Sequence, residues 1–342
     1  MKKALIAMSG GVDSSVAGLL AQKQGWDCVG CTMQLQEGQD MTDAQAVATR
    51  LQMPFHVFDF TADFKAKVID KFIASYEQGL TPNPCVDCNR ELKFGQLYQK
   101  ARELGCNLVV TGHYARIEKI GTQYYLKKAL DASKDQSYFL YHLGQTQLAQ
   151  TAFPLGELTK AQVREIAQGH GFANAQKKES QDICFVPDGD YAQVIQHYTG
   201  KQYPCGNFVD TNGKVLGQHR GIIHYTVGQR KGLSIAADQR LYVCQICPQS
   251  NTVCLCARDG LLQSEATAVA CHWVNGVPKE RVFRCHVKIR YNQKEQPATV
   301  EVLSDNQVKV IFDEPQRAVT PGQALVMYQD DIVLGGGILT KA

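Results

Sequence analysis

The sequence lacks any apolar run close to the ~18 residues that a membrane-spanning helix needs. It also lacks internal repeats and low-complexity tracts, and the apolar stretch within Met1 to Gly10 is too short for a signal peptide. These absences argue against a membrane protein, a repeat array and an exported protein. We therefore expect a soluble, cytoplasmic protein.

The composition is that of an ordinary globular chain. Apolar residues make up 44% and charged residues 20% of the 342 residues, which excludes a disordered tail protein and a collagen-like rod. A chain of this length suggests two or three domains. Residues 201–342 carry 16 Lys or Arg and 12 Asp or Glu, a net charge of +4, whereas residues 1–200 carry 20 and 21, a net charge of −1. A mildly basic C-terminal part suits a polyanionic partner, although a chance imbalance explains it equally well.

Cysteine is abundant. The thirteen cysteines are odd in number, and no export signal precedes them. Metal binding, thiol chemistry or simple burial is therefore favoured over a disulfide framework.

The hydrophobic pattern predicts three parts. Up to about residue 200, short apolar runs such as 3–8 alternate with helical segments such as 15–24 and 91–104, which is typical of an α/β fold with a parallel sheet covered on both faces. After Gly200 strands dominate, and residues 221–226 are predicted to be one of them. We expect a domain over 1–200, a small mixed domain over 201–273, and an all-β barrel or sandwich over 274–342.

A glycine-rich turn follows the first predicted strand. The segment from Ser9 to Ser15 reads Ser-Gly-Gly-Val-Asp-Ser-Ser and precedes a predicted helix. Adjacent glycines bring bare N–H groups close to a phosphate, and a helix N-terminus favours an anion. Asp13 would hold Mg²⁺ beside the phosphates. The segment has no Gly-Lys-Ser/Thr, so it is not a Walker loop; the alternative is a plain β–α turn with a serine cap.

Two further segments carry thiols. Residues 81–90 read Thr-Pro-Asn-Pro-Cys-Val-Asp-Cys-Asn-Arg, which predicts an extended loop with a thiol pair just before a helix. Arg90 near Cys88 would lower the pKa of that thiol. Residues 177–185 place Cys184 after two adjacent lysines. The alternative for each cysteine is an inert, buried side chain.

The glycine-rich segment resembles the signature of the PP-loop ATP pyrophosphatases, which cleave ATP between the α and β phosphates. With the thiol segments, the chain resembles the bacterial tRNA-specific 2-thiouridylases nearly end to end. The resemblance includes Lys-Asp-Gln-Ser-Tyr-Phe-Leu at 134–140 and Gly-Gln-Arg-Lys-Gly-Leu at 228–233. It implies an α/β PP-loop domain of the adenine-nucleotide hydrolase-like type, a small central domain and a C-terminal β-barrel.

The resemblance also implies roles for individual residues. Cys88 matches the nucleophile and Cys184 the cysteine that carries a persulfide. The residues implied at ATP are Ala7, Met8, Ser9, Gly10, Gly11, Val12, Asp13, Ser14, Met33 and Gly112. Those implied at the target base or elsewhere on tRNA are Asn83, Pro84, Cys85, His113, Lys134, Asp135, Gln136, Arg290, Tyr291 and Gln323. Lys134 and Arg290 could equally be ordinary surface charges.

The implied reaction is ATP-dependent thiolation at C2 of the wobble uridine, through an adenylated base and a persulfide. The implied partners are tRNA, with glutamate, glutamine and lysine acceptors favoured, and a cysteine desulfurase or sulfur-relay protein. A different PP-loop ligase would need no paired thiols. A non-catalytic tRNA-binding protein would not retain Asp13, Cys88 and Cys184 together.

Some cysteines depart from the family pattern. Cys85 stands where some members have Asp, so Cys85, Cys88 and Cys184 could instead ligate a four-iron four-sulfur cluster. The sequence does not decide between relay and cluster. Cys28 and Cys31 have no implied role. Cys244, Cys247, Cys254 and Cys256 have the spacing of a zinc knuckle, but a β-hairpin containing small apolar cysteines is favoured there.

Overall fold

Five parallel strands form the N-terminal sheet of the computed structural model, which describes residues 2–177 and 183–341. Their order is β3 (Phe55–Asp59), β2 (Asp27–Gln34), β1 (Lys3–Ala7), β4 (Leu108–Val110) and β7 (Thr151–Ala152). All neighbours pair in parallel. The carboxyl ends of β1, β2 and β4 therefore meet at one edge, where open α/β sheets bind their ligands.

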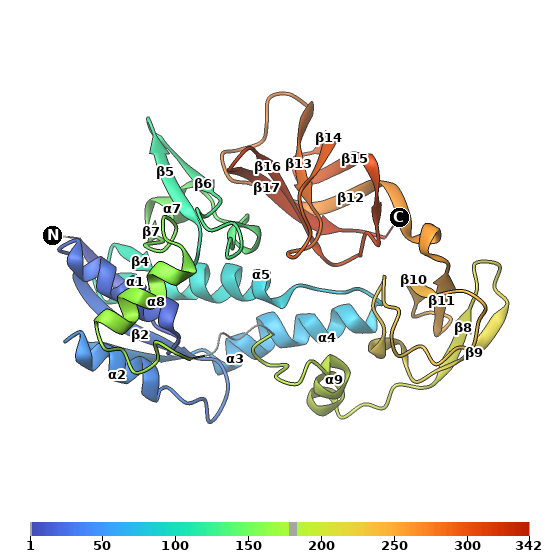
Figure 1. Cartoon of the computed structure of the whole chain (residues 1–342), viewed down its shortest axis with the longest axis horizontal. Helices are drawn as coiled ribbons and strands as arrows, with labels where there is room; N and C mark the ends of the chain where they lie inside the picture. Colours follow the sequence, from blue (N-terminus) through green and yellow to red (C-terminus); the bar gives the residue numbers. More distant parts are fainter. Residues whose placement is uncertain (1, 178–182, 342) are drawn as a thin grey trace.

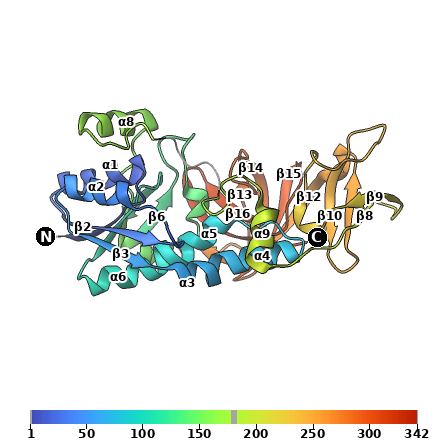
Figure 2. The same cartoon turned by 90° about the horizontal axis from the view of Figure 1, so that it is seen from below.

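Helices cover both faces of this sheet (Figure 2). One face packs on α1 (Val12–Lys23), α2 (Thr42–Arg50) and α8 (Lys160–Gly169), and the other on the α3–α4 segment (Thr61–Glu77) and the helix over 84–103. The side chains of β1 alternate accordingly, with Ile6 in the first core and Leu5 in the second. The predicted strand–helix alternation is confirmed.

The helix that carries the thiol pair begins earlier than predicted. It starts at Pro84 as α5 (Pro84–Cys88) and continues through a π-helical segment, η2 (Asn89–Gln96), into α6 (Leu97–Glu103). Pro84 occupies the first helical position, where its missing N–H is not needed, and the Asn83 side chain accepts a hydrogen bond from the Cys85 N–H at 3.2 Å. The two thiols therefore lie within the helix, and the prediction that they stand just before it was wrong.

The middle of the chain forms a second sheet, in the order β10–β11–β8–β9. Its strands are β8 (Gly206–Val209), β9 (Val215–His219), β10 (Tyr242–Cys247) and β11 (Thr252–Cys256), and α9 (Tyr191–Thr199) precedes them. The strand predicted over 221–226 is wrong: a short 3₁₀ helix over Ile222–His224 occupies this segment. Gly221, at φ +112°, turns the chain immediately before it.

The C-terminal part closes into a barrel (Figure 1). The strand order is β12–β15–β14–β13–β16–β17, and β12 also pairs with β17, so the six strands have no free edge. These strands are β12 (Leu262–Trp273), β13 (Val282–Lys288), β14 (Gln296–Ser304), β15 (Gln307–Arg317), β16 (Ala324–Gln329) and β17 (Ile332–Leu339). The expected barrel is confirmed.

A hairpin from the N-terminal part extends the barrel sheet. It consists of β5 (Arg116–Ile120) and β6 (Gln123–Lys127), and β6 pairs with β17. The shorter elements are α7 (Gln145–Ala149) and the 3₁₀ turns over Ser137–Phe139 and Arg258–Leu261. Within 2–177 and 183–341 no helix is both long and apolar enough to cross a membrane.

Candidate ATP and thiol site

The glycine-rich segment wraps the N-terminus of α1, directly after β1. Gly10 has φ +76°, which glycine tolerates best, and the Ser14 hydroxyl donates to the Gly11 carbonyl at 3.0 Å while accepting from the Ser9 N–H at 3.1 Å. The Ser15 hydroxyl donates to the same carbonyl at 3.0 Å. The two hydroxyls therefore hold the shape of the turn while the N–H groups of the first helical turn remain available for an anion.

Two residues from other elements press on this turn. The Asn174 amide donates to the Gly10 carbonyl at 2.9 Å and to the Ser15 hydroxyl at 3.0 Å, a contact that the sequence analysis missed. Gly112, just after β4, approaches so closely that a Cβ there would lie 2.7 Å from the Ser14 nitrogen. Only glycine permits this approach, which explains the residue type at 112.

Asp13 is held by a cation and a hydroxyl. The Lys160 ammonium, at the start of α8, lies 2.7 and 2.8 Å from the two carboxylate oxygens, and the Tyr114 hydroxyl donates to one of them at 2.8 Å. The Lys160 side chain is 11% exposed and that of Asp13 is 30% exposed. Sequence reasoning missed Lys160. A carboxylate already neutralised in this way is not arranged as a magnesium ligand.

The other residues implied at ATP also lie near the carboxyl edge of the sheet. Ala7 ends β1, and the Met8 N–H donates to the Cys31 carbonyl of β2 at 2.7 Å. Met33 lies near the end of β2, and its carbonyl accepts from the Gln39 side chain at 3.2 Å. Parallel pairing therefore brings residues from three separate strands to the edge at which α1 begins.

The structure brings Cys184 to the thiol pair, although 95 residues separate it from Cys88. Phe185, next to Cys184, is buried against Phe64 and Phe72 at ring distances of 5.7 and 5.2 Å. These rings belong to the α3–α4 segment, which packs beside α5. An aromatic anchor on the following residue thus places the Cys184 thiol. Residues 178–182 of its motif lie outside the described residues.

Burial and one lysine control the ionisation of these thiols. Burial, together with a smaller contribution from the nearby Cys184 thiol, raises the pKa of Cys85 to about 11 and that of Cys88 to about 12. The pKa of Cys184 is also raised by burial. The Lys93 ammonium opposes the shift at all three thiols, because a cation favours the thiolate. The sequence analysis missed Lys93, which lies five residues after Cys88 in the π-helical segment.

The expectation that Arg90 activates Cys88 was wrong. The Arg90 guanidinium binds Asp87 at 3.0 Å and Glu91 at 2.8 Å, and Lys71 binds Asp87 at 2.6 Å. Asp87 lies between the two cysteines of α5 and is only 6% exposed. Arg90 therefore satisfies a buried carboxylate. Lys177 is likewise paired with a carboxylate, that of Asp43, at 2.6 Å.

The loop before α5 is fastened to the barrel. The Gln323 amide donates to the carbonyls of Thr81 at 2.8 Å and Pro82 at 3.3 Å, and the Thr81 N–H donates to the Pro321 carbonyl at 2.9 Å. Asn83 and Pro84 follow directly. The C-terminal barrel thus fixes the position of the segment that carries the thiols.

Several residues implied at tRNA have internal partners. His113 is 7% exposed, its ring packs on Phe94 and Phe153, and burial lowers its pKa well below the usual value. The Asp135 carboxylate accepts from Ala129 and Ser137. The Gln136 side chain accepts from the N–H of Tyr114, whose hydroxyl reaches Asp13.

The remaining residues of this group meet at the junction of the domains. Tyr291 packs on Phe139 with ring centroids 4.4 Å apart. The Arg290 guanidinium donates to the carbonyls of Val227 at 3.0 Å and Ala318 at 3.1 Å, and to the Thr320 hydroxyl. Arg290 therefore joins the central part of the chain to the barrel. Lys134 lies on the partly exposed turn just before Asp135.

The other motif cysteines are structural in their placement. Cys28 and Cys31 are buried in β2. The cysteines at 244, 247, 254 and 256 lie on the antiparallel hairpin β10–β11, as favoured from the sequence. Within 2–177 and 183–341 no three His, Cys, Asp or Glu side chains are grouped so that they could hold a metal ion.

Three family models match the chain. They are described as the tRNA methyl transferase HUP domain (residues 2–188), the tRNA methyl transferase PRC-barrel domain (192–257) and the aminomethyltransferase beta-barrel domain (263–339). The first alone covers more than half of the chain. The three matched ranges follow the three sheets described above.

Full-length relatives are similar to the whole chain. The chain is 45% identical over 356 residues to the tRNA-specific 2-thiouridylase MnmA of Clostridioides difficile, covering 100% of this chain and 99% of the relative. It is 46% identical to that of Geotalea uraniireducens, covering 100% and 96%. Among solved structures, it resembles a 4-thiouridine synthetase in complex with RNA and bound ATP, at 22% identity and TM-score 0.35, over 54% of this chain and 44% of that chain.

Proposed function

The chain belongs to the family of tRNA-specific 2-thiouridylases, and on that premise we propose that it uses ATP to replace O2 of the wobble uridine of tRNA with sulfur. The observation that supports this most is the gathering of Cys85, Cys88 and Cys184 in one fold with a phosphate-binding turn. The three family descriptions name methyl or aminomethyl transferases. Thiolation is favoured because the full-length relatives are named thiouridylases.

The first step activates the base. Uridine O2 attacks the α-phosphate of ATP, pyrophosphate leaves, and the base becomes an adenylate. The free N–H groups at the start of α1 stabilise the phosphate charge, and Gly112 lets this turn lie close to the nucleotide. Asp13 keeps Lys160 beside the turn. The base must first leave its stack, which costs a few kcal/mol.

The second step transfers sulfur. A persulfide on Cys184 attacks C2 through its terminal sulfur, and AMP leaves with the former O2. The Cys88 thiolate attacks the Cys184 sulfur, so the transferred atom is reduced and a Cys88–Cys184 disulfide forms. Alternatively, Cys88 attacks first and releases sulfide, which then attacks C2. An external thiol reduces the disulfide in either order.

The arrangement of the donors favours this relay over an iron–sulfur cluster. Cys85, Cys88 and Cys184 are close enough to affect one another's pKa, yet no three such donors within the described residues are grouped as a metal site. We therefore derive no step through a cluster, nor through Mg²⁺ at Asp13. Magnesium would enter on the phosphates of ATP.

The relay requires a protein partner that delivers the persulfide sulfur, a cysteine desulfurase or a sulfur-relay protein. We propose a cytoplasmic location, because the proposed substrate is tRNA. We also propose a three-domain organisation with boundaries near residue 200 and between residues 261 and 274. Strand β12 belongs with the last domain, because it pairs with β15 and β17.

Mass spectrometry of tRNA nucleosides tests the function. A strain lacking the gene should contain no 2-thiouridine at the wobble position, and the wild-type gene should restore it. The same gene carrying Cys205→Ser, which alters an exposed cysteine outside the thiol group, should restore it equally. Unchanged 2-thiouridine in the deletion strain would refute the proposal.

Three cysteine variants test the relay. Cys88→Ser and Cys184→Ser should abolish thiolation, whereas Cys85→Ser should retain substantial activity. Iron and sulfide are measured in protein purified without oxygen. Iron-loaded protein whose activity is lost on Cys85→Ser would replace the relay with the cluster.

A further inference from the structure

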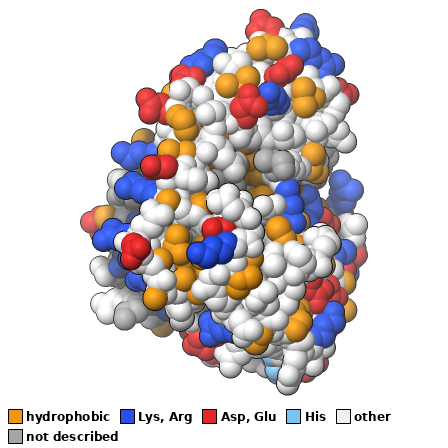
Figure 3. Space-filling model, turned by 90° about the vertical axis from the view of Figure 1, so that its right-hand side faces the viewer, with side chains coloured by type: hydrophobic (Ala, Val, Ile, Leu, Met, Phe, Trp, Pro, Cys, Tyr) orange, Lys and Arg blue, Asp and Glu red, His pale blue; other side chains and the backbone are white. Residues whose placement is uncertain are grey.

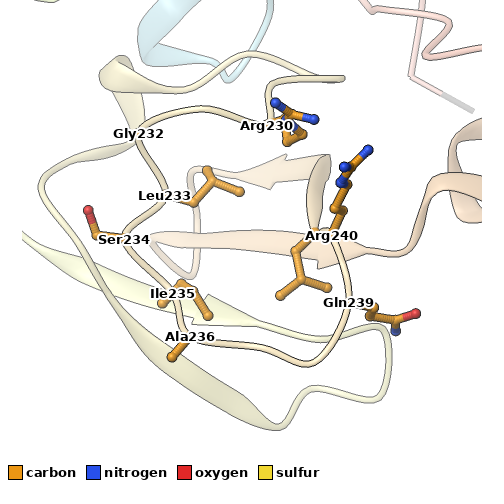
Figure 4. Close-up of a pocket in the computed structure, with 9 residues that line it drawn as sticks. Arg230, Gly232, Leu233, Ser234, Ile235, Ala236, Gln239 and Arg240 are labelled. Atoms are coloured by element: carbon orange, nitrogen blue, oxygen red, sulfur yellow. The ribbon is translucent and has the colours of Figure 1, made fainter.

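A cavity of about 460 Å³ lies in the central part of the chain, apart from all residues assigned above to ATP, sulfur or tRNA. Residues of the loop over 230–241 line it, and this loop overlaps the Gly-Gln-Arg-Lys-Gly-Leu segment at 228–233. In Figure 4, Arg230 and Arg240 lie beside each other at one rim, while Leu233 and Ile235 extend toward the interior. The cavity thus combines an apolar wall with a cationic rim.

The cations at this rim have no acidic partner. Arg230, Lys231 and Arg240 are exposed, and none forms an ion pair or a side-chain hydrogen bond with any residue of 2–177 or 183–341. In the barrel, the exposed Arg281 and Arg284 are paired with Asp305 and Asp313. The exposed Lys279, Lys294 and Arg317 form no ion pair with any residue of 2–177 or 183–341. Water screens the repulsion between two exposed guanidinium groups, and an anion bound between them would stabilise their proximity.

The positive net charge of the C-terminal half lies in the central part of the chain, which contains the cavity. Residues 192–257 contain six Lys or Arg and two Asp or Glu, a net charge of +4, whereas residues 263–339 contain eight and nine, a net charge of −1. The excess noted for residues 201–342 therefore belongs to the central part rather than to the barrel. Figure 3 shows Lys and Arg side chains spread over this end of the molecule, among Asp and Glu side chains.

The chain that leads into the cationic loop packs on the barrel. Val227 and Gly228 lead into it; Arg290 donates to the Val227 carbonyl, and a Cβ on Gly228 would lie 2.9 Å from that of Ala318. Shortly after Ala318, the Thr320 hydroxyl accepts a hydrogen bond from Arg290. The Pro321 carbonyl accepts one from the N–H of Thr81, which precedes the thiol helix. The chain that leads into this loop and the segment before the thiol helix are therefore both attached to the same stretch of the barrel, residues 318–321.

We propose that the cavity between Arg230 and Arg240 is a second RNA subsite, which binds a phosphodiester of the substrate tRNA away from the target base. The inference rests on the proposed function. Two guanidinium forks suit phosphate oxygens, and the apolar wall of Leu233 and Ile235 accepts a ribose or base edge. We favour RNA over an acidic protein as the occupant, because an acidic protein surface would use the cationic rim but not the apolar wall.

The test compares two double variants of equal charge change in the full-length protein. Arg230→Ala/Arg240→Ala removes the rim cations. Lys23→Ala/Arg102→Ala removes two exposed, unpaired cations from α1 and α6 at the other end of the molecule. Affinity for an unmodified glutamate-acceptor tRNA is measured from 50 to 300 mM salt. ATP affinity, and thiolation of saturating tRNA with the sulfur-donor protein, are measured in parallel.

The rim variant should bind tRNA about tenfold more weakly at low salt, and its log–log salt slope should fall by about 1 to 2, with ATP affinity unchanged. The control should change neither. Unchanged tRNA binding by the rim variant would overturn the subsite. If tRNA binding is unchanged but thiolation is slowed at low concentrations of the sulfur-donor protein, the rim binds that protein instead. Wild-type protein that binds no tRNA would refute the proposed function itself.

Discussion

The ammonium group of Lys160 contacts both carboxylate oxygens of Asp13, at 2.7 and 2.8 Å, although the two residues are 147 positions apart in the chain. The pair joins the phosphate-binding turn to the first turn of α8. Tyr114 adds a hydroxyl to the same carboxylate. The charge balance at the turn therefore depends on three elements, and a phosphate arriving there would meet a cation that is already in place.

Asp13→Ala should abolish adenylation, because Lys160 loses the carboxylate that positions it. Affinity for tRNA should stay within a few-fold, since the proposed RNA contacts lie elsewhere. Pyrophosphate release measures the first and filter binding the second. Full thiolation by this variant would show that Asp13 is not part of the ATP site.

Lys160→Met should slow pyrophosphate release by about 100-fold or more, the typical effect of losing a charge that stabilises a reacting oxyanion. The matched control is Lys100→Met, which breaks a pair between Lys100 and Glu103 of similar length on exposed α6. The control should retain its rate within a factor of about two. Equal rates for both variants would make Lys160 a structural partner only.

Lys93→Met should make the Cys88 thiol less reactive at neutral pH. The pKa of Cys88 is raised by burial to about 12 and is pulled down by Lys93, so removing the ammonium raises it further. Alkylation, followed by peptide mass spectrometry from pH 7 to 10, should slow by about three- to tenfold, in proportion to the thiolate lost. Lys93→Arg should preserve the rate and Lys65→Met, on the exposed surface, should not alter it. An unchanged pH profile in Lys93→Met would exclude this role.

Lys134→Ala and Arg290→Ala should both lower the salt slope of tRNA binding by about 1 if each contacts a phosphate. Arg290→Ala should also lower the thermal midpoint, because its three internal acceptors lose their donor. A slope that is unchanged in both variants would return both residues to structural or surface roles.

Burial of His142 should make the free energy of unfolding fall in acid. It is 5% exposed, both ring nitrogens lack a partner among the described residues, and burial beside Arg90 lowers its pKa to about 3. The folded state favours the neutral ring. The contribution of His142 to the free energy of unfolding is therefore complete above the pKa of the unfolded chain, near 6.5. It is lost as the pH falls toward 3, by up to about 4 kcal/mol. The free energy of unfolding, measured in urea between pH 3 and 7, should fall less in acid for His142→Phe than for the wild type. The exposed variant His56→Gln should behave like the wild type. Identical acid limbs would contradict this assignment.

The local patterns of the sequence determined much of this protein. Strand β1, the Ser-Gly-Gly-Val-Asp-Ser turn and the helix after it follow from neighbouring residues, as does the hairpin that carries Cys244 and Cys254. The start of the thiol helix at Pro84 was also encoded locally, in the Asn83 cap, but the two prolines suggested an extended loop instead. The strand predicted over 221–226 failed because its apolar alternation resembles that of a strand, while Gly221 turns the backbone.

Only the tertiary structure decided which charges meet. Lys160 reaches Asp13, and Phe185 places Cys184 beside Cys88, because helices packed on the same sheet bring distant segments together. Arg90, adjacent in sequence to the thiol helix, is turned instead to Asp87. Spacing along a chain gives the direction of a side chain only within one element; across elements, the packing of the core sets the direction, and ionisation follows from it.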